Sequence, residues 1–138
     1  MKKPIIYEEF IDVRFSDLDP YNHVNSNLYM EYVLTSRWIF AKKHFDLTAD
    51  ELVKKGIGFY IKQSLVKYKR PIIGYPKIFV TSHISKYEGP LLQISFEIRS
   101  EDKSILHSEG VIDAIAMDLN TIKPNPLPDW AERYFLTE

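Results

Sequence analysis

The apolar positions along the 138-residue chain change from a two-residue period to a helical period and back again. Residues 5–15 alternate between apolar and polar side chains, with Glu9 as the exception, which predicts a strand with one solvent-facing side. Residues 26–45 carry apolar side chains at spacings of three and four without any Gly or Pro, which predicts a long helix. Met30 and Trp38 add apolar surface beside the main stripe, so we expect this helix to be enclosed on several sides.

A second, shorter helix is predicted directly after the long one. Thr48 and Glu51 have the spacing of a capping box, and Gly56 stands where such a helix would end. The two-residue period then returns and stops near Asp118, before a proline-rich tail that cannot continue a sheet. Strands separated by turn-forming residues are predicted in this part of the chain over 59–70, 78–87, 91–100 and 105–117.

Together these elements predict an α+β fold in which residues 1–138 form a single domain. Short connections favour antiparallel neighbours, so we expect a curved antiparallel sheet of about five strands around the long helix. Such a sheet leaves open edges, and we therefore expect a homodimer, although scattered exposed aromatic residues are also normal on monomers. The apolar residues predicted on the solvent-facing side of the sheet are Tyr60, Val66, Tyr68, Phe79 and Tyr87.

Composition removes several classes of function. Lys and Arg number 18 against 19 acidic residues, so there is no broad basic face and nucleic acid binding is disfavoured. The absence of cysteine excludes disulfides, thiolate nucleophiles and Cys-based zinc sites, and it fits a protein of the reducing cytoplasm. No segment approaches the roughly 20 apolar residues that cross a membrane, and the amino terminus is unlike a secretion signal.

Known chemical motifs are also missing. The chain contains no serine hydrolase elbow, no P-loop and no dinucleotide-binding glycine motif. Its four histidines form no pair with the spacing of metal ligands, so we expect no metal.

Polar residues are instead concentrated between the first strand and the long helix, in FSDLDPYNHVNSN. Asp17, Asp19 and His23 stand where the helix begins, next to backbone N–H groups that lack intrahelical partners. Such amides can hold the oxyanion that forms when an acyl carbonyl is attacked. A nearby aspartate can attack the carbonyl or draw a proton from water, and a histidine can share the proton transfer. The segment therefore predicts an acyl-transfer site.

Structural roles remain open for the same residues. For Asp17 the structural role is favoured, because an aspartate often closes a turn through its side chain. Asp19 fits either catalysis or helix capping, and His23 fits either proton transfer or a structural contact. Asn25 and the two polar residues that follow it are first of all candidate helix caps.

The segment SDLDPYNHVNSNLYMEYVLTSR resembles the signature of the hotdog-fold acyl-CoA thioesterases of the 4-hydroxybenzoyl-CoA thioesterase type, which are related to acyl-ACP thioesterases. The family pattern is D-x-D-x-x-x-H-V-N-N-x-x-Y, followed by an arginine further along the helix. Ser26 stands in place of the second Asn. VKYKRPIIGY at 66–75 and the proline-rich end of the chain are similar to the family as well. The positions that match the pattern are Asp17, Asp19, His23, Val24, Asn25, Tyr29 and Arg37.

This resemblance implies a hotdog fold whose subunits pair through their sheets as a homodimer, often as a dimer of dimers, with active sites at the subunit interface. It also implies that Asp19 is the essential carboxylate. Acyl-ACP enzymes place an Asn two residues after this Asp, where the chain has Tyr21. Acyl-CoA is therefore the expected substrate and acyl-ACP the alternative, and no cofactor is expected because CoA is part of the substrate.

We accordingly expect hydrolysis of an acyl-CoA thioester to a carboxylic acid and free CoA. Asp19 would act as general base or nucleophile, and His23 and Asn25 would position the turn or assist proton transfer. A non-catalytic acyl-thioester or lipid-binding module and a purely structural dimer are the alternatives.

Substrate-binding residues are predicted from their chemistry. Tyr29, Tyr32 and Phe59 are candidates for an apolar acyl slot between helix and sheet, although core packing would explain all three. CoA phosphates require cations, which a solvated strand end would also carry. The nearest cationic cluster consists of Lys67, Lys69 and Arg70.

Overall fold

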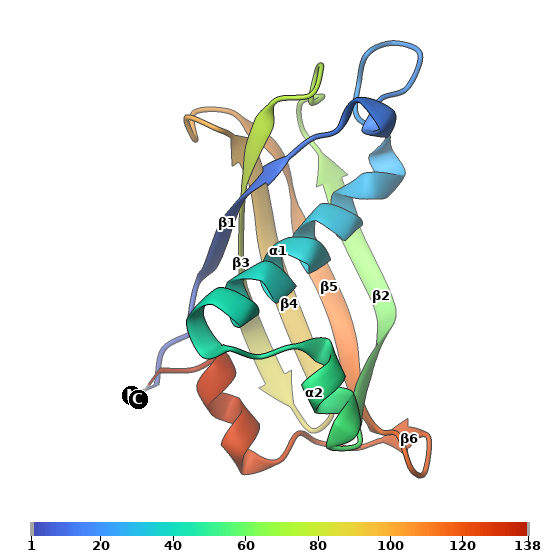
Figure 1. Cartoon of the computed structure of the whole chain (residues 1–138), viewed down its shortest axis with the longest axis vertical. Helices are drawn as coiled ribbons and strands as arrows, with labels where there is room; N and C mark the ends of the chain where they lie inside the picture. Colours follow the sequence, from blue (N-terminus) through green and yellow to red (C-terminus); the bar gives the residue numbers. More distant parts are fainter. Residues whose placement is uncertain (1, 138) are drawn as a thin grey trace.

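The computed structural model describes residues 2–137, and their strands form one antiparallel sheet that curves around a long helix (Figure 1). The strand order is β1-β3-β4-β5-β2, and a short β6 pairs with β5. The expected α+β architecture, a curved antiparallel sheet with one long central helix, is confirmed. The strands are β1 Tyr7–Asp12, β2 Ile57–Tyr68, β3 Lys77–Glu88, β4 Leu91–Ser100, β5 Leu106–Asp118 and β6 Lys123–Pro124.

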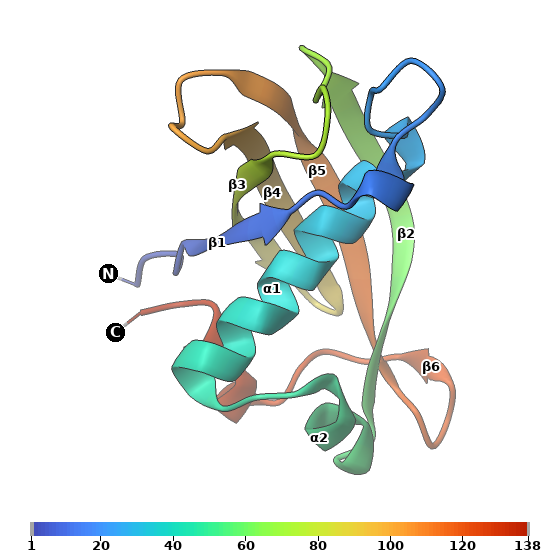
Figure 2. The same ribbon diagram turned by 45° about the horizontal axis from the view of Figure 1, so that its top comes forward.

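Helix α1, Tyr29–Phe45, lies across the concave face of the sheet, and the shorter α2, Ala49–Lys54, follows it (Figure 2). The Thr48 hydroxyl accepts a hydrogen bond from the Glu51 N–H at 3.3 Å, which is the cap predicted for α2. Gly56 follows that helix with a φ of 81°, a left-handed conformation that glycine adopts without strain. Short 3-10 turns are η1 Phe15–Asp17, η2 Ser26–Leu28 and η3 Asp129–Tyr134. Within residues 2–137, no helix is long and apolar enough to cross a membrane.

The main core lies between α1 and the concave face of the sheet. Val33 of the helix is completely buried there, and the strands contribute branched aliphatic side chains. This packing removes from water the apolar stripe that predicted the helix. The completely buried strand residues of this core are Ile78, Val80, Ile98 and Ile112.

Three irregularities interrupt the strand pairing of residues 2–137, one of them between β4 and β5 at Ile98 and Arg99. The other two change which of the predicted solvent-facing side chains face the helix. One lies in β2 between Ile61 and Gln63, and the other lies in β3 between Ile84 and Lys86. An extra residue reverses the alternation of faces beyond it. Five apolar residues were predicted on the solvent-facing side of the sheet. That prediction is wrong for three of them, which face the helix side instead: Val66, Tyr68 and Tyr87.

The outer face of the sheet also differs from expectation. Phe79 does lie there, but it is buried, because the Phe10 ring packs 4.9 Å from it and the Lys103 ammonium lies 4.5 Å from its centroid. Strand β2 forms one edge of the sheet and stays open along its length. Its apolar side chains that are more than a third exposed are Phe59, Tyr60, Ile61, Leu65 and Tyr68.

The first strand is shorter than predicted. It ends at Asp12, and Phe15 lies in the following turn with 77% of its surface exposed. Glu9, the exception in the alternating pattern, is buried, and its carboxylate accepts a hydrogen bond from the Lys43 ammonium at 2.9 Å. That charge-assisted contact offsets the cost of burying the carboxylate.

Candidate active site

The segment between β1 and α1 folds back on itself into a closed loop. Leu18 and Val24 form a β-bridge at its base, and the Asp19 N–H donates to the His23 carbonyl at 2.7 Å. A neighbouring segment holds the loop in place, because the Val24 N–H donates to the Ile72 carbonyl at 2.9 Å. The two polar residues Asp19 and His23 therefore face each other across the loop through their backbones.

The Asp19 carboxylate uses one of its oxygens to hold this loop. Its Oδ1 accepts hydrogen bonds from the backbone N–H groups of Tyr21 at 2.8 Å and His23 at 3.1 Å. Its Oδ2 makes no hydrogen bond with any residue that the structure describes, and the residue is half-buried. One oxygen thus fixes the orientation of the carboxylate and the other stays available for chemistry.

The other two predicted catalytic residues have different surroundings. His23 is half-buried, and its ring makes no hydrogen bond to another residue of the described chain. Asn25 connects the end of the loop to its beginning, because its N–H and its side-chain Nδ2 both donate to the Asp17 carbonyl, at 3.0 and 3.3 Å. The structure therefore brings the three residues into one loop, but no hydrogen bond joins the side chain of one to that of another.

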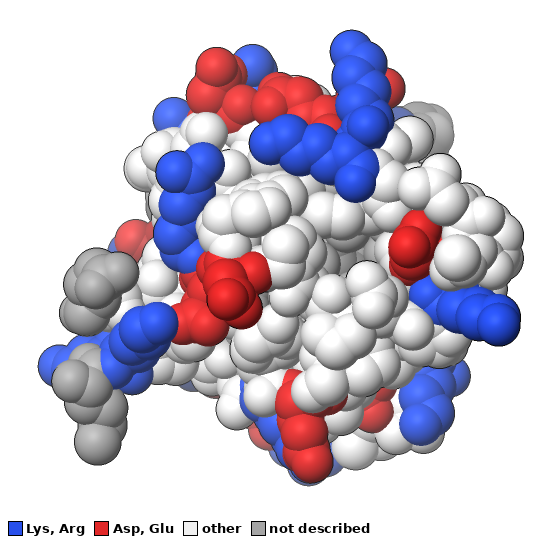
Figure 3. Space-filling model, turned by 90° about the horizontal axis from the view of Figure 1, so that it is seen from below, with Lys and Arg blue, Asp and Glu red and all other residues white. Residues whose placement is uncertain are grey.

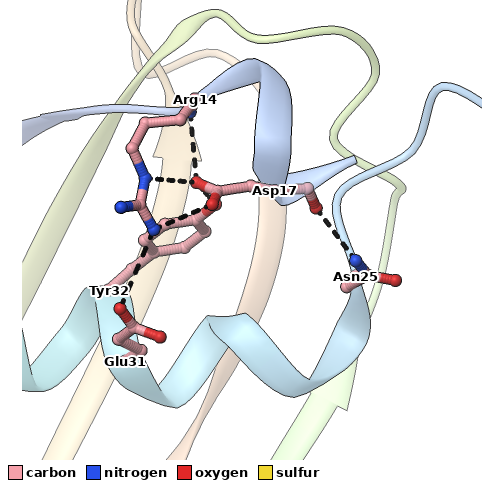
Figure 4. A network of polar contacts seen from close by, with 5 residues as sticks. All are labelled: Arg14, Asp17, Asn25, Glu31 and Tyr32. Atoms are coloured by element: carbon pink, nitrogen blue, oxygen red, sulfur yellow. Dashed lines mark hydrogen bonds and ion pairs between the residues drawn. The ribbon is translucent and has the colours of Figure 1, made fainter. Parts of the chain in front are cut away.

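Asp17 is the most buried residue of this segment, and it anchors the loop to the helix (Figure 4). Its Oδ2 accepts a hydrogen bond from the Tyr32 hydroxyl at 2.7 Å, and the Arg14 guanidinium donates to its Oδ1 at 2.9 Å. Burial alone would raise the pKa of Asp17, but these hydrogen bonds and the Arg14 charge outweigh it and hold that pKa below its usual range. Burial, followed by the hydrogen bond with Asp17, raises the pKa of Tyr32, so the tyrosine remains a donor.

We expect Asp17→Asn to lower the free energy of unfolding by about 2–3 kcal/mol at pH 7, because it removes the charge from a buried, hydrogen-bonded pair. The pKa of Asp17 is lower in the folded protein than in the unfolded one. Its stabilisation is therefore present above the unfolded value, near pH 4, and is lost as the pH falls through the folded value. Urea unfolding followed by circular dichroism at pH 7 and pH 3 measures both effects.

Asp19→Asn is the matched control for that measurement. Residue 19 is only half-buried, and an Asn Oδ1 can accept the same two backbone hydrogen bonds. Its stability should stay within about 0.5 kcal/mol of wild type. Equal stability of the Asp17 variant and wild type would contradict the structural role of Asp17.

The start of the helix offers unpaired amides. Neither η2 nor α1 has a side-chain cap, so the prediction that Asn25 or one of the next two residues caps the helix is wrong. The backbone N–H groups of Ser26 and Asn27 have no acceptor among residues 2–137. They are free to donate to an oxyanion.

The predicted cationic residues lie at the end of β2 and just beyond it, on either side of Tyr68. The Tyr68 hydroxyl at the end of β2 donates to the Ser26 carbonyl at 3.0 Å, which holds that strand end against the helix start. Lys67, Lys69 and Arg70 are exposed there, and Lys69 lies 4.0 Å from the Glu109 carboxylate. The three cations are therefore accessible to a phosphate in solution.

An apolar cavity of about 170 Å³ lies under the other half of α1, next to α2 and η3. Phe59, a predicted acyl-slot residue, lines it together with Ala41, Leu52 and Ala114. Tyr29 and Tyr32 do not line it. They pack in the main core instead, which was the alternative prediction for both residues. From below, the middle of the face at this end of the molecule is uncharged, and the charged side chains surround it (Figure 3).

The structure does not bring the loop and the cavity of one chain together. No residue between β1 and α1 lines the cavity, and the two features lie at opposite ends of the long helix.

Sequence reasoning missed most of the cavity wall, including its one arginine. Arg37 lines it, although the pattern of the helix gave a signal. Arg37 follows the buried Val33 by four residues and precedes the buried Phe40 by three, so it interrupts the buried stripe. As for metal sites, no group of three or more ligand side chains clusters within residues 2–137.

Comparison with known proteins agrees with this architecture. Residues 13–135 match the model of the family described as Thioesterase-like superfamily. Long-chain acyl-CoA thioesterase FadM of Escherichia coli K12 is 26% identical over 113 residues, which cover 82% of this chain and 84% of that protein.

Solved structures share the fold. DHNA-CoA thioesterase from Staphylococcus aureus superposes with a TM-score of 0.82 at 23% identity, over 94% of this chain and 88% of that one. The S. aureus protein SAV2348, solved in complex with CoA, superposes with a TM-score of 0.82 at 16% identity, over 95% and 82%. At these identities the likeness confirms the hotdog-type fold.

Proposed function

This chain belongs to the thioesterase-like superfamily, and we propose that it hydrolyses an acyl-CoA thioester to a carboxylic acid and free CoA. The observation that carries the proposal is the Asp19 carboxylate, which is held by one oxygen and free at the other. The FadM relative is named an acyl-CoA thioesterase, which supports the same reaction.

The loop and the helix start supply the groups that such a reaction needs. Oδ2 of Asp19 takes a proton from water as water attacks the thioester carbonyl, or attacks that carbonyl itself and forms an anhydride that water then opens. In both routes the carbonyl oxygen becomes an oxyanion, which the amides of Ser26 and Asn27 stabilise. The C–S bond then breaks, and the CoA thiolate leaves and takes up a proton. His23 and Asn25 position the loop or assist the proton transfer.

A homodimer would join the loop of one chain to the cavity of the other. If two copies pair antiparallel along the open edge of β2, the Tyr68 end of one strand meets the Ile57 end of the other. The Tyr68 end holds the helix start and the loop, while Phe59 and Ile61 near the other end line the cavity. We therefore propose that each active site combines the Asp19 loop of one subunit with the acyl cavity of its partner, in a dimer or a dimer of dimers.

The carrier is proposed to be CoA. Lys67, Lys69 and Arg70 would contact its phosphates, and a structure with the same fold is described in complex with CoA. Tyr21, which stands where acyl-ACP enzymes have an Asn, is 81% exposed and leaves that alternative arrangement incomplete. We also propose a cytoplasmic location, which the cysteine-free composition supports.

The cavity limits the acyl group. An engineered cavity of about 150 Å³ holds one benzene ring, so a cavity of about 170 Å³ has room for an aryl group or a short chain, and longer chains would have to extend beyond it.

The test is thiol release from purified wild-type protein with aryl, short-chain and long-chain acyl-CoAs and with acyl-ACP. We expect turnover of acyl-CoA, and higher kcat/KM for the acyl groups that fit the cavity. Binding of acyl-CoA without turnover of any thioester would contradict the proposed hydrolysis and support a non-catalytic acyl-thioester-binding module. Turnover of acyl-ACP alone would overturn the choice of carrier.

A further inference from the structure

One residue of the cavity wall, Arg37, is a cation without an anionic partner among residues 2–137. Its Nη1 donates to the Ser82 hydroxyl at 2.9 Å, and its guanidinium carbon lies 4.1 Å from the centroid of the Tyr7 ring. No Asp or Glu oxygen of residues 2–137 lies within 4.0 Å of its nitrogens. Burial lowers the pKa of Arg37 to about 10, so at neutral pH the group is still a cation.

The buried carboxylates of the described chain are all engaged elsewhere. Glu9 pairs with Lys43, and Asp17 pairs with Arg14 and Tyr32. Asp113 lies on the outer face of the sheet and accepts hydrogen bonds from two glutamine amides, at 2.7 and 3.1 Å. Within residues 2–137, no carboxylate therefore neutralises Arg37.

Two nitrogens of Arg37, Nε and Nη2, have no hydrogen-bond partner within residues 2–137. No fully buried side-chain nitrogen or oxygen in that part of the chain lacks a partner, so these two must retain accessible surface. The Nε–Nη2 edge of a guanidinium is one of the two edges that bind a carboxylate through parallel hydrogen bonds.

We propose that Arg37 binds a carboxylate at the far end of the acyl group, so that the preferred substrates are CoA monothioesters of dicarboxylic acids. This inference rests on the proposed thioesterase function and names the substrate class of that site. A plain hydrocarbon chain in the same cavity would exclude water from the guanidinium without replacing its hydrogen bonds. A carboxylate replaces them, and the apolar wall around it accommodates the methylene chain.

The first experiment compares wild-type kcat/KM for CoA monothioesters of four- to ten-carbon dicarboxylic acids with saturated acyl-CoAs of the same length. We expect at least about a tenfold preference for the dicarboxylic series at one chain length, as for sites built around a specific polar partner. Arg37→Met should bring this ratio to about one. Arg37→Lys keeps the charge without the two-pronged geometry and should retain part of the ratio. Met and Lys are both good helix formers, so the pair is matched.

Two results would overturn the proposal: no preference for the dicarboxylic series at any chain length in wild type, or an unchanged ratio in Arg37→Met. Hydrolysis of saturated acyl-CoAs without a preference would remove this inference and leave the proposed function intact.

A second measurement needs no turnover. Calorimetry should show octanoate binding to wild type at least about tenfold more tightly than octan-1-ol, because only the former carries a carboxylate. Arg37→Met should lose that difference. Equal binding of the two by wild type would overturn the carboxylate site whether or not the protein hydrolyses thioesters.

Discussion

Asp19→Asn is expected to lower kcat for acyl-CoA hydrolysis by about 10²- to 10⁴-fold, the range found for loss of a general base. The substitution keeps an oxygen that can accept the hydrogen bonds from the Tyr21 and His23 amides. It replaces the free Oδ2 by an NH₂ group, which can neither take a proton from water nor attack a carbonyl. The loss should therefore appear in kcat, while KM changes little. Thiol release at saturating acyl-CoA gives kcat, and urea unfolding checks that the fold is kept.

His23→Gln gives a graded comparison for this result. The His23 ring makes no hydrogen bond within residues 2–137. If His23 only assists proton transfer, His23→Gln should lower kcat less than Asp19→Asn does. Unchanged turnover in Asp19→Asn would contradict the assignment of Asp19 as the essential carboxylate. Asp17 would then be the next candidate for that role. A wild-type rate in Asp19→Asn together with a large loss in His23→Gln would assign the base to the histidine.

The hydrophobic periodicity was sufficient to predict the order and type of the main elements, because each strand and helix buries one regular face. It was not sufficient to assign faces beyond the irregularities near Gln63 and Lys86. A single extra residue leaves the local pattern of Tyr68 and Tyr87 almost unchanged, yet it reverses the direction of both side chains. Such a shift is decided by pairing with neighbouring strands, which a local pattern does not contain.

The predicted site is likewise partly local and partly not. The hydrogen bonds of the Asp19 carboxylate are local, because both donors lie within four positions of it. The loop around it also depends on a distant segment, since the Val24 N–H donates to the Ile72 carbonyl. The roles of two other residues depend on partners far along the chain. Arg37 meets Ser82 and Tyr7 only after the sheet has closed over the helix, and Asp17 meets Tyr32 only once α1 is in place.

A mixture of Asp19→Asn and Ala114→Phe subunits is expected to recover activity that neither variant has alone. Ala114 lines the cavity and is almost completely buried, so a phenyl ring there fills space that the acyl group needs. In a mixed dimer, the loop of the Ala114→Phe chain meets the intact cavity of the Asp19→Asn chain, and this site is complete. With random mixing about half of the dimers are mixed and each has one complete site, so about a quarter of the wild-type activity returns.

Co-refolded chains, checked by native mass spectrometry for mixed dimers of the 16.2-kDa subunit, provide the measurement. If loop and cavity of the same chain formed a site, a mixed dimer would contain one site without its carboxylate and one without its cavity, and no activity would return. Mixing wild type with the Asp19→Asn, Ala114→Phe double variant should give the opposite result. If the site is shared between chains, the mixed dimers are inactive. If each site lies within one chain, the wild-type chain of every mixed dimer stays active. Opposite outcomes in the two mixtures therefore decide how the ends of the long helix are joined into one active site, and a protein that sediments as a single chain would exclude the shared site altogether.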